Sequence, residues 1–205
     1  MSGMFSNTPF NGDISKWNVS RVEDFSNMFR ASAFDNDIAF WDTRNAVNMR
    51  SMFEDTPFNQ DISLWDVSGV QDFSSMFYRS MFNNDIGGWT TSSADSMYGM
   101  FKSSSFNRDI HAWDVSSVAD LSAMFYNSSF NQDIGNWTPS SAGTLSNMFA
   151  FASDFNQNLC AWGASLDFPG VDFMFDSTAC LNQSDPFFYG ILWSPLCFDC
   201  EPPMI

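Results

Sequence analysis

The chain has 205 residues and contains 24 Phe, 8 Trp and 13 Met, enough apolar material for a well-buried domain, which excludes a disordered chain. Its formal net charge is −16, so neither nucleic acid nor an anionic membrane surface is an expected partner. No apolar run approaches the ~18 residues of a membrane span, and no transmembrane segment is expected.

A repeat of 24 residues organises the sequence. Met-Phe pairs begin at Met4, Met28, Met52, Met76, Met100, Met124 and Met148. A Trp column keeps the same spacing through Trp17, Trp41, Trp65, Trp89, Trp113 and Trp137, and ends at Trp162. A period of this length is typical of proteins in which successive repeats stack and bury a common core.

Each repeat predicts one short helix and one short strand. Val22, Phe25, Met28 and Phe29 follow a helical spacing, and Ser20 with Glu23 matches a capping box. A strand is expected near residues 58–63. The expected fold class is therefore α/β: a right-handed leucine-rich-repeat-like solenoid of about seven coils over residues 1–163, the first coil truncated.

Residues 164–205 lose the register and are expected to form a Cys- and Pro-rich cap. Cys160, Cys180, Cys197 and Cys200 lie in or next to this segment, which favours disulfides. Cys160–Cys180 with Cys197–Cys200 is one of three pairings. A zinc site is the alternative, although only Cys197 and Cys200 have the close spacing of paired ligands.

The first coil lacks most of its predicted helix, because residue 1 lies three positions before a Met-Phe pair. An uncapped end exposes core residues. We therefore expect either that the native chain extends upstream or that this edge pairs with another chain.

The residues from Phe58 to Ser68, Phe-Asn-Gln-Asp-Ile-Ser-Leu-Trp-Asp-Val-Ser, resemble the repeat of the BspA-like surface proteins. The resemblance covers residues 1 to about 163. It implies a leucine-rich-repeat-type solenoid, an extracellular or cell-surface location, and adhesion to a protein or glycan ligand of a matrix or another cell.

A column of aspartates forms one candidate site. Its members are Asp13, Asp37, Asp61, Asp85, Asp109 and Asp133. Carboxylates in line repel each other, so something must offset the charge. Each could accept backbone N–H bonds in an Asx turn, the column could bind Ca²⁺ as its cofactor, or solvent could screen it.

The positions that vary between repeats are where a ligand would be recognised. Two of them lie between the repeated Ile and Trp, and they place Phe40, Leu64 and His111 as candidate partner contacts. The Trp column has two interpretations: a stacking platform for sugars, or a ladder packed in the core.

Catalysis has almost no support in the sequence. The single histidine, His111, occupies a variable position, and no nucleophile set, metal motif or phosphate loop is present. We therefore expect a non-enzymatic interaction or adhesion module. The alternative is a structural protein that self-assembles into filaments or layers through its open N-terminal coil.

Overall fold

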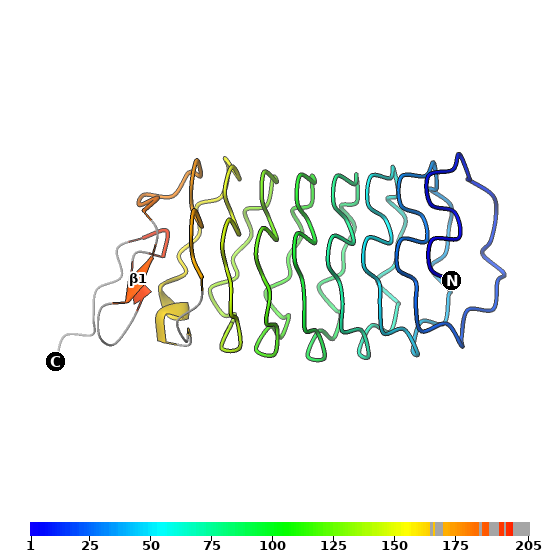
Figure 1. Ribbon diagram of the computed structural model, residues 1–205, viewed down its shortest axis with the longest axis horizontal. Helices are drawn as coiled ribbons and strands as arrows, with labels where there is room; N and C mark the ends of the chain where they lie inside the picture. Colours follow the sequence, from blue (N-terminus) through cyan, green and yellow to red (C-terminus); the bar gives the residue numbers. More distant parts are fainter. Residues whose placement is uncertain (165, 167–169, 185, 189–192, 195, 199–205) are drawn as a thin grey trace.

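The chain forms a row of stacked coils in a computed structural model, which describes residues 1–164, 166, 170–184, 186–188, 193–194 and 196–198 (Figure 1). Regular secondary structure in these residues is confined to the C-terminal part. It comprises the 3₁₀ helix η1 (Cys160–Ala164) and the strands β1 (Phe187–Phe188) and β2 (Trp193–Ser194). The two strands pair antiparallel, with Phe187 opposite Ser194.

Equivalent residues of successive repeats are neighbours in space. Parallel bridges join Asp24 to Asn48, Asn48 to Asp72, Asp72 to Ser96, Ser96 to Asp120, Asp120 to Thr144 and Thr144 to Gly170. Beside each bridge, alternate backbone N–H groups of the Met-Phe segment donate to carbonyls of the following coil. In one coil, Ser51 N donates to Ser74 O and Phe53 N to Met76 O, both at 2.9 Å. The coils are therefore joined by a ladder that runs along the stack.

The same segment closes turns within the coil, and this makes the predicted α/β fold class wrong. Met52 N donates to Met49 O and Glu54 N to Ser51 O, bonds that span three residues instead of four. Ser51 and Asp55 have φ of 53° and 57°, the left-handed region that a right-handed helix excludes. The described repeats contain no helix at 20–29 and no strand at 58–63, so the helix-and-strand coil of a leucine-rich repeat is absent.

The capping-box residue Ser20 has another role in the structure. Its hydroxyl and its N–H both donate to Asn18 Oδ1, at 2.7 and 3.1 Å, and they stabilise a bend that precedes the turn at Val22. The Ser-x-x-Glu pattern is therefore part of a turn.

Stacked aromatic rings fill the interior. Phe29 lies 5.7 Å from Phe53 between ring centroids, and Trp41 lies 6.4 Å from Trp65, with each pair nearly parallel. Burial of one such side chain is worth roughly 1.5–3 kcal/mol, and no single coil can achieve it alone. Packing between coils is therefore the main source of stability.

Asparagine side chains form a second ladder on the outside of the stack. The Oδ1 atom of Asn59 accepts the N–H of Asn83 at 2.9 Å, and Asn83 Oδ1 accepts the N–H of Asn107 at 3.0 Å. Asp35 occupies the same position one coil earlier and accepts the N–H of Asn59 at 3.0 Å. The position requires a side-chain acceptor of this length, which explains the repeated Asn after Phe.

The stack continues into the segment that was expected to form the cap. Leu145 N donates to Gly170 O at 2.6 Å, and Phe175 stacks on Phe149 with ring centroids 5.8 Å apart. Residues 170–177 thus provide one more Met-Phe segment, which covers the aromatic core of the coil before it.

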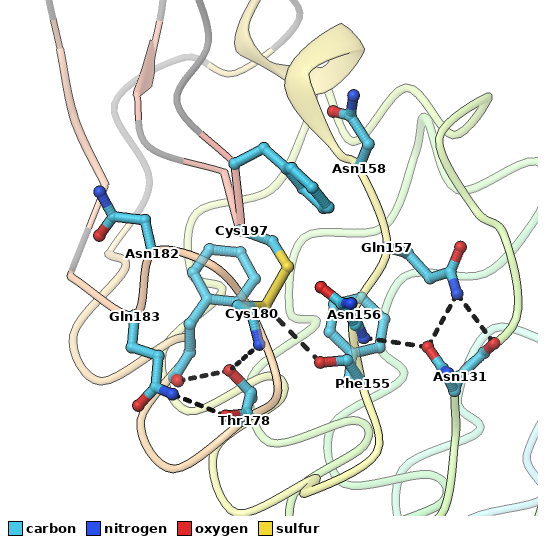
Figure 2. The surroundings of a disulfide bond; sticks show 12 residues. Asn131, Phe155, Asn156, Gln157, Asn158, Thr178, Cys180, Asn182, Gln183 and Cys197 are labelled. Atoms are coloured by element: carbon cyan, nitrogen blue, oxygen red, sulfur yellow. Dashed lines mark hydrogen bonds between the residues drawn. A yellow bond between two sulfur atoms is a disulfide. The ribbon is translucent and has the colours of Figure 1, made fainter.

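A disulfide joins Cys180 to Cys197 in this segment (Figure 2). The expectation of a disulfide in this segment is confirmed, and of the three possible pairings the one that joins Cys160 to Cys180 and Cys197 to Cys200 is excluded. Cys180 follows the turn at Thr178, and its buried sulfur lies next to the carbonyl of Phe155. Cys197 comes from a later part of the chain, and its Cα lies 4.8 Å from that of Cys180. A zinc site that uses Cys180 or Cys197 as thiolates is excluded by the same bond. Cys200 lies outside the described residues.

Candidate functional site

Two residues between the repeated Ile and Trp form the tip of a turn in every complete coil. In one coil Ile62 O accepts the N–H of Trp65 at 3.1 Å, and Asp61 Oδ1 accepts the N–H of Ser63 at 2.9 Å. The repeated Asp, Ile and Trp hold the backbone, which leaves the tip side chains free to vary. We call these tips the variable turns; they are residues 15–16, 39–40, 63–64, 87–88, 111–112 and 135–136.

Each aspartate of the predicted cation column accepts the N–H two residues later, in an Asx turn. The bonds to residues 15, 39, 63, 87, 111 and 135 measure 2.8–3.0 Å. The N–H and hydroxyl of Ser63 lower the pKa of Asp61, and the N–H and ring of His111 lower that of Asp109. Among the described residues, no group of three or more His, Cys, Asp or Glu side chains could hold a metal ion.

Phe40 and Leu64 occupy the same position in adjacent coils and extend into solvent, with 84% and 71% of their surfaces exposed. Leu64 borders a shallow depression with Trp41, Asp42 and Arg44. Arg44 donates to Asp42 at 2.7 Å, so a charged pair lies beside the apolar pair. The structure thus brings together two of the three predicted contact residues.

His111 does not join them. The coil with Gly87 and Gly88 separates its variable turn from that of Leu64, and neither glycine offers a side chain that could connect the two. The imidazole Nδ1 lies 2.8 Å from Asp109 Oδ1 within its own turn. The exposed apolar pair therefore ends at Leu64, and we call Phe40 and Leu64 the apolar tip pair.

The tryptophans are part of the core. Those from Trp41 to Trp162 are buried, and the indole N–H of each donates to the carbonyl of an Ile in the preceding coil, at 3.0–3.2 Å. A sugar platform built on these six rings is excluded. Trp17 differs, because it is 38% exposed at the first coil.

The structure also groups aromatic and basic residues on the outer side of the Met-Phe segments, and this group was not predicted from the sequence. Tyr78, Lys102 and Tyr126 occupy one position in three successive coils, and Lys102 Nζ lies 5.7 and 4.7 Å from the centroids of the two rings. Tyr98 is close by and exposed. Their clustering could have been recognised, since three of the four tyrosines of the chain fall between residues 78 and 126.

No helix in the described part of the chain is long and apolar enough to cross a membrane.

Comparison with known proteins identifies a family but no characterised relative. No curated protein and no solved structure matches the chain significantly. One family model matches twice, over residues 1–105 and 80–186, so the two matches together span residues 1–186. These matches support a family of repeat proteins without singling out the BspA-like proteins. The chain belongs to the family described as "Mycoplasma protein of unknown function, DUF285".

Proposed function

We propose that this chain is a non-enzymatic interaction module that acts outside the cell and adheres to a macromolecular partner through its variable turns. The observation that carries the proposal is that each coil combines residues that are the same in every repeat with residues that vary. Repeated Asp, Ile and Trp residues fix the backbone of the turn, whereas the pair of side chains at its tip differs from coil to coil. A scaffold that is constant inside and variable outside is the arrangement by which stacked-repeat proteins present binding surfaces.

The apolar tip pair is the proposed centre of contact. Exposed aromatic and aliphatic side chains that lie side by side cost solvation free energy unless a partner covers them. Arg44 and Asp42 beside Leu64 supply the polar border that surrounds the apolar centre of a protein interface. A partner with a small apolar surface and adjacent charged groups fits this arrangement, which favours a protein ligand at this place.

The extracellular location is supported by the Cys180–Cys197 disulfide. Structural disulfides persist in oxidising compartments and are rare in the cytosol. The BspA-like resemblance of residues 58–68 implies the same location and an adhesive role.

A double variant tests the adhesion proposal. Phe40→Asp with Leu64→Asp should leave the melting temperature unchanged and reduce binding to immobilised matrix proteins or host cells at least tenfold. Met81→Asp is the matched control, because Met81 is also exposed but lies outside the variable turns. Equal loss in both variants, or unchanged binding of the double variant, would refute the placement of the contact.

Stacking of copies through the first coil is the second candidate function. The N–H groups of Gly3 and Phe5 donate to the following coil, whereas the carbonyls of Ser2 and Met4 accept no bond from any described residue. Met4 is also 50% exposed, unlike the buried Met at this position in later coils. A second copy would cover this edge, and so would residues that precede Met1 in a longer protein.

Light scattering against concentration separates the two functions. Growth of the particle mass with concentration, without any ligand, supports stacking. A concentration-independent monomer that binds matrix or cells supports the adhesion module alone.

A further inference from the structure

A groove crosses three coils on the outer side of the Met-Phe segments, away from the variable turns. It is an open hollow at the surface with a volume of about 380 Å³. Tyr98 and Lys102 come from one coil and Tyr126 with Ser122 from the next. Thr144, Ser146 and Asn147 from the third coil complete the lining, together with Ala123.

Lys102 is the charged group of this groove. Its ammonium lies between the rings of Tyr78 and Tyr126, and no carboxylate of the described residues lies within 4.0 Å of it. Arg30, Arg44, Arg50 and Arg79 each have an acidic neighbour. Among the residues that the structure describes, Lys102 shares the absence of an ion pair with Lys16, Arg21 and Arg108, and it differs from them in its two aromatic neighbours. The rings hold the cation through its attraction to their π faces, and they leave its hydrogen-bonding capacity unused.

The other lining groups also have unused capacity. The hydroxyls of Tyr98, Tyr126 and Ser146 and the side-chain amide of Asn147 make no hydrogen bond with the described part of the chain. Donors and acceptors arranged around tyrosine rings suit a sugar, whose C–H face packs on an aromatic ring while its hydroxyls bond at the edge.

The charge of Lys102 and the net charge of the chain determine which kind of sugar suits the groove. A free cation in the groove favours a ligand with a carboxylate, because an ammonium–carboxylate hydrogen bond is stronger than one between neutral groups. The net charge of −16 repels long polyanions, so a sugar with a single charge is favoured over a sulfated polymer.

We propose that this groove binds a carboxylate-bearing saccharide of the uronic- or sialic-acid type, with Lys102 on the carboxylate and Tyr98 against the sugar ring, because the ring of Tyr126 already contacts Lys102 and Phe151. The site is separate from the apolar tip pair and does not depend on the adhesive function proposed for it.

Saturation-transfer NMR and calorimetry test the proposal with two matched pairs of probes. These are methyl glucuronide against methyl glucoside, and sialyllactose against lactose. We expect an acidic sugar to bind, its neutral counterpart to bind at least tenfold more weakly, and added salt to weaken the binding.

Lys102→Gln should reduce binding of the acidic sugar at least tenfold, while the loss of its contacts with the two rings lowers the melting temperature only slightly. Lys16→Gln, at the only other lysine of the chain, should leave binding unchanged. Tyr98→Ala provides a second variant, because Tyr98 is exposed and contributes little to the core. Tyr98→Ala should weaken the binding of an acidic sugar and that of its neutral counterpart by the same factor.

Failure of both acidic sugars to bind, equal binding of the neutral sugars, or full binding by Lys102→Gln would overturn the assignment. Binding of phosphotyrosine in place of any sugar would overturn it as well. Phe40→Asp with Leu64→Asp should retain sugar binding, so the failure of one site does not imply failure of the other.

Discussion

The indole N–H of Trp65 donates to the carbonyl of Ile38, 27 residues earlier in the chain, at 3.1 Å. The same carbonyl also accepts the N–H of Trp41, which closes the turn of its own coil. One oxygen thus joins a local turn to the next coil, and the repeat of Ile and Trp is explained by this double contact.

Trp65→Phe should destabilise the chain by about 1–3 kcal/mol. The change removes a buried hydrogen bond and leaves space in the stacked core. Trp17→Phe is the control and should cost less than about 1 kcal/mol, because Trp17 is partly exposed and its indole N–H has no acceptor among the described residues. Urea unfolding measures both values, and equal losses would contradict the role of the bond.

The asparagine ladder should tolerate an Asp in place of an Asn but not an Ala. Asn59→Ala should cost about 1 kcal/mol, because the N–H of Asn83 loses its acceptor. Asn59→Asp should be nearly neutral, since Asp35 already fills this position and accepts the N–H of Asn59. Thermal unfolding of the two variants distinguishes them, and an Asp variant as unstable as the Ala variant would refute the requirement for an acceptor.

Two alanines two residues apart should respond in opposite ways to glycine. Ala31 has φ of 52°, where a side chain is strained, whereas Ala33 is not among the residues with positive φ. Ala31→Gly relieves about 1–2 kcal/mol of strain and partly offsets the entropy that glycine loses on folding. We expect it to be more stable than Ala33→Gly by about 1–2 kcal/mol in urea unfolding. A difference near zero would mean that the left-handed residues carry little strain.

The sequence was sufficient to predict which residues are neighbours but not the local backbone. A 24-residue register in several columns already indicates that Trp41 lies next to Trp65, and the rings do stack. The predicted helix was wrong because left-handed residues every four positions, such as Asn27 and Ala31, turn the chain with a period close to the 3.6 of a helix. Over eight residues the two periods place the same side chains inward.

The candidate sites were predictable to different degrees. Exposure of Phe40 and Leu64 followed from their position between repeated residues, because only the repeated ones were needed for the core. The spacing of Tyr78, Lys102 and Tyr126 can be recognised in the sequence, whereas the shape of the groove cannot, since it depends on the backbone turns of the Met-Phe segments. The Cys180–Cys197 bond depends on the path of residues 170–184, which follow no repeat after the Met-Phe pair.

Calcium provides a direct test of the aspartate column. One oxygen of each carboxylate is already bonded within its Asx turn, so we expect neither added Ca²⁺ nor EDTA to change the melting temperature. A rise with Ca²⁺ that EDTA reverses, and that Asp61→Asn abolishes, would instead show that the column binds the ion.

Asp66 and Asp114 should make the stability depend on pH. The hydroxyl and then the N–H of Ser68 lower the pKa of Asp66 below its ordinary value of 3.8, and Ser116 has the same effect on Asp114. A carboxyl whose pKa is lower in the folded state stabilises the fold above its ordinary pKa, and this contribution is lost as the pH falls through the folded value. Between about pH 6 and about pH 2.5, the melting temperature should therefore fall more in the wild type than in Asp66→Asn with Asp114→Asn.

Asparagine is a suitable replacement in this experiment because the chain already contains it. Asn18 occupies the same position in the first coil, and its Oδ1 accepts the hydroxyl of Ser20 at 2.7 Å, as a carboxylate does in later coils. The double variant should therefore fold normally at neutral pH, and any difference at low pH reports the two titrations. Identical pH profiles would mean that these turns are as well formed with a protonated carboxyl as with an ionised one.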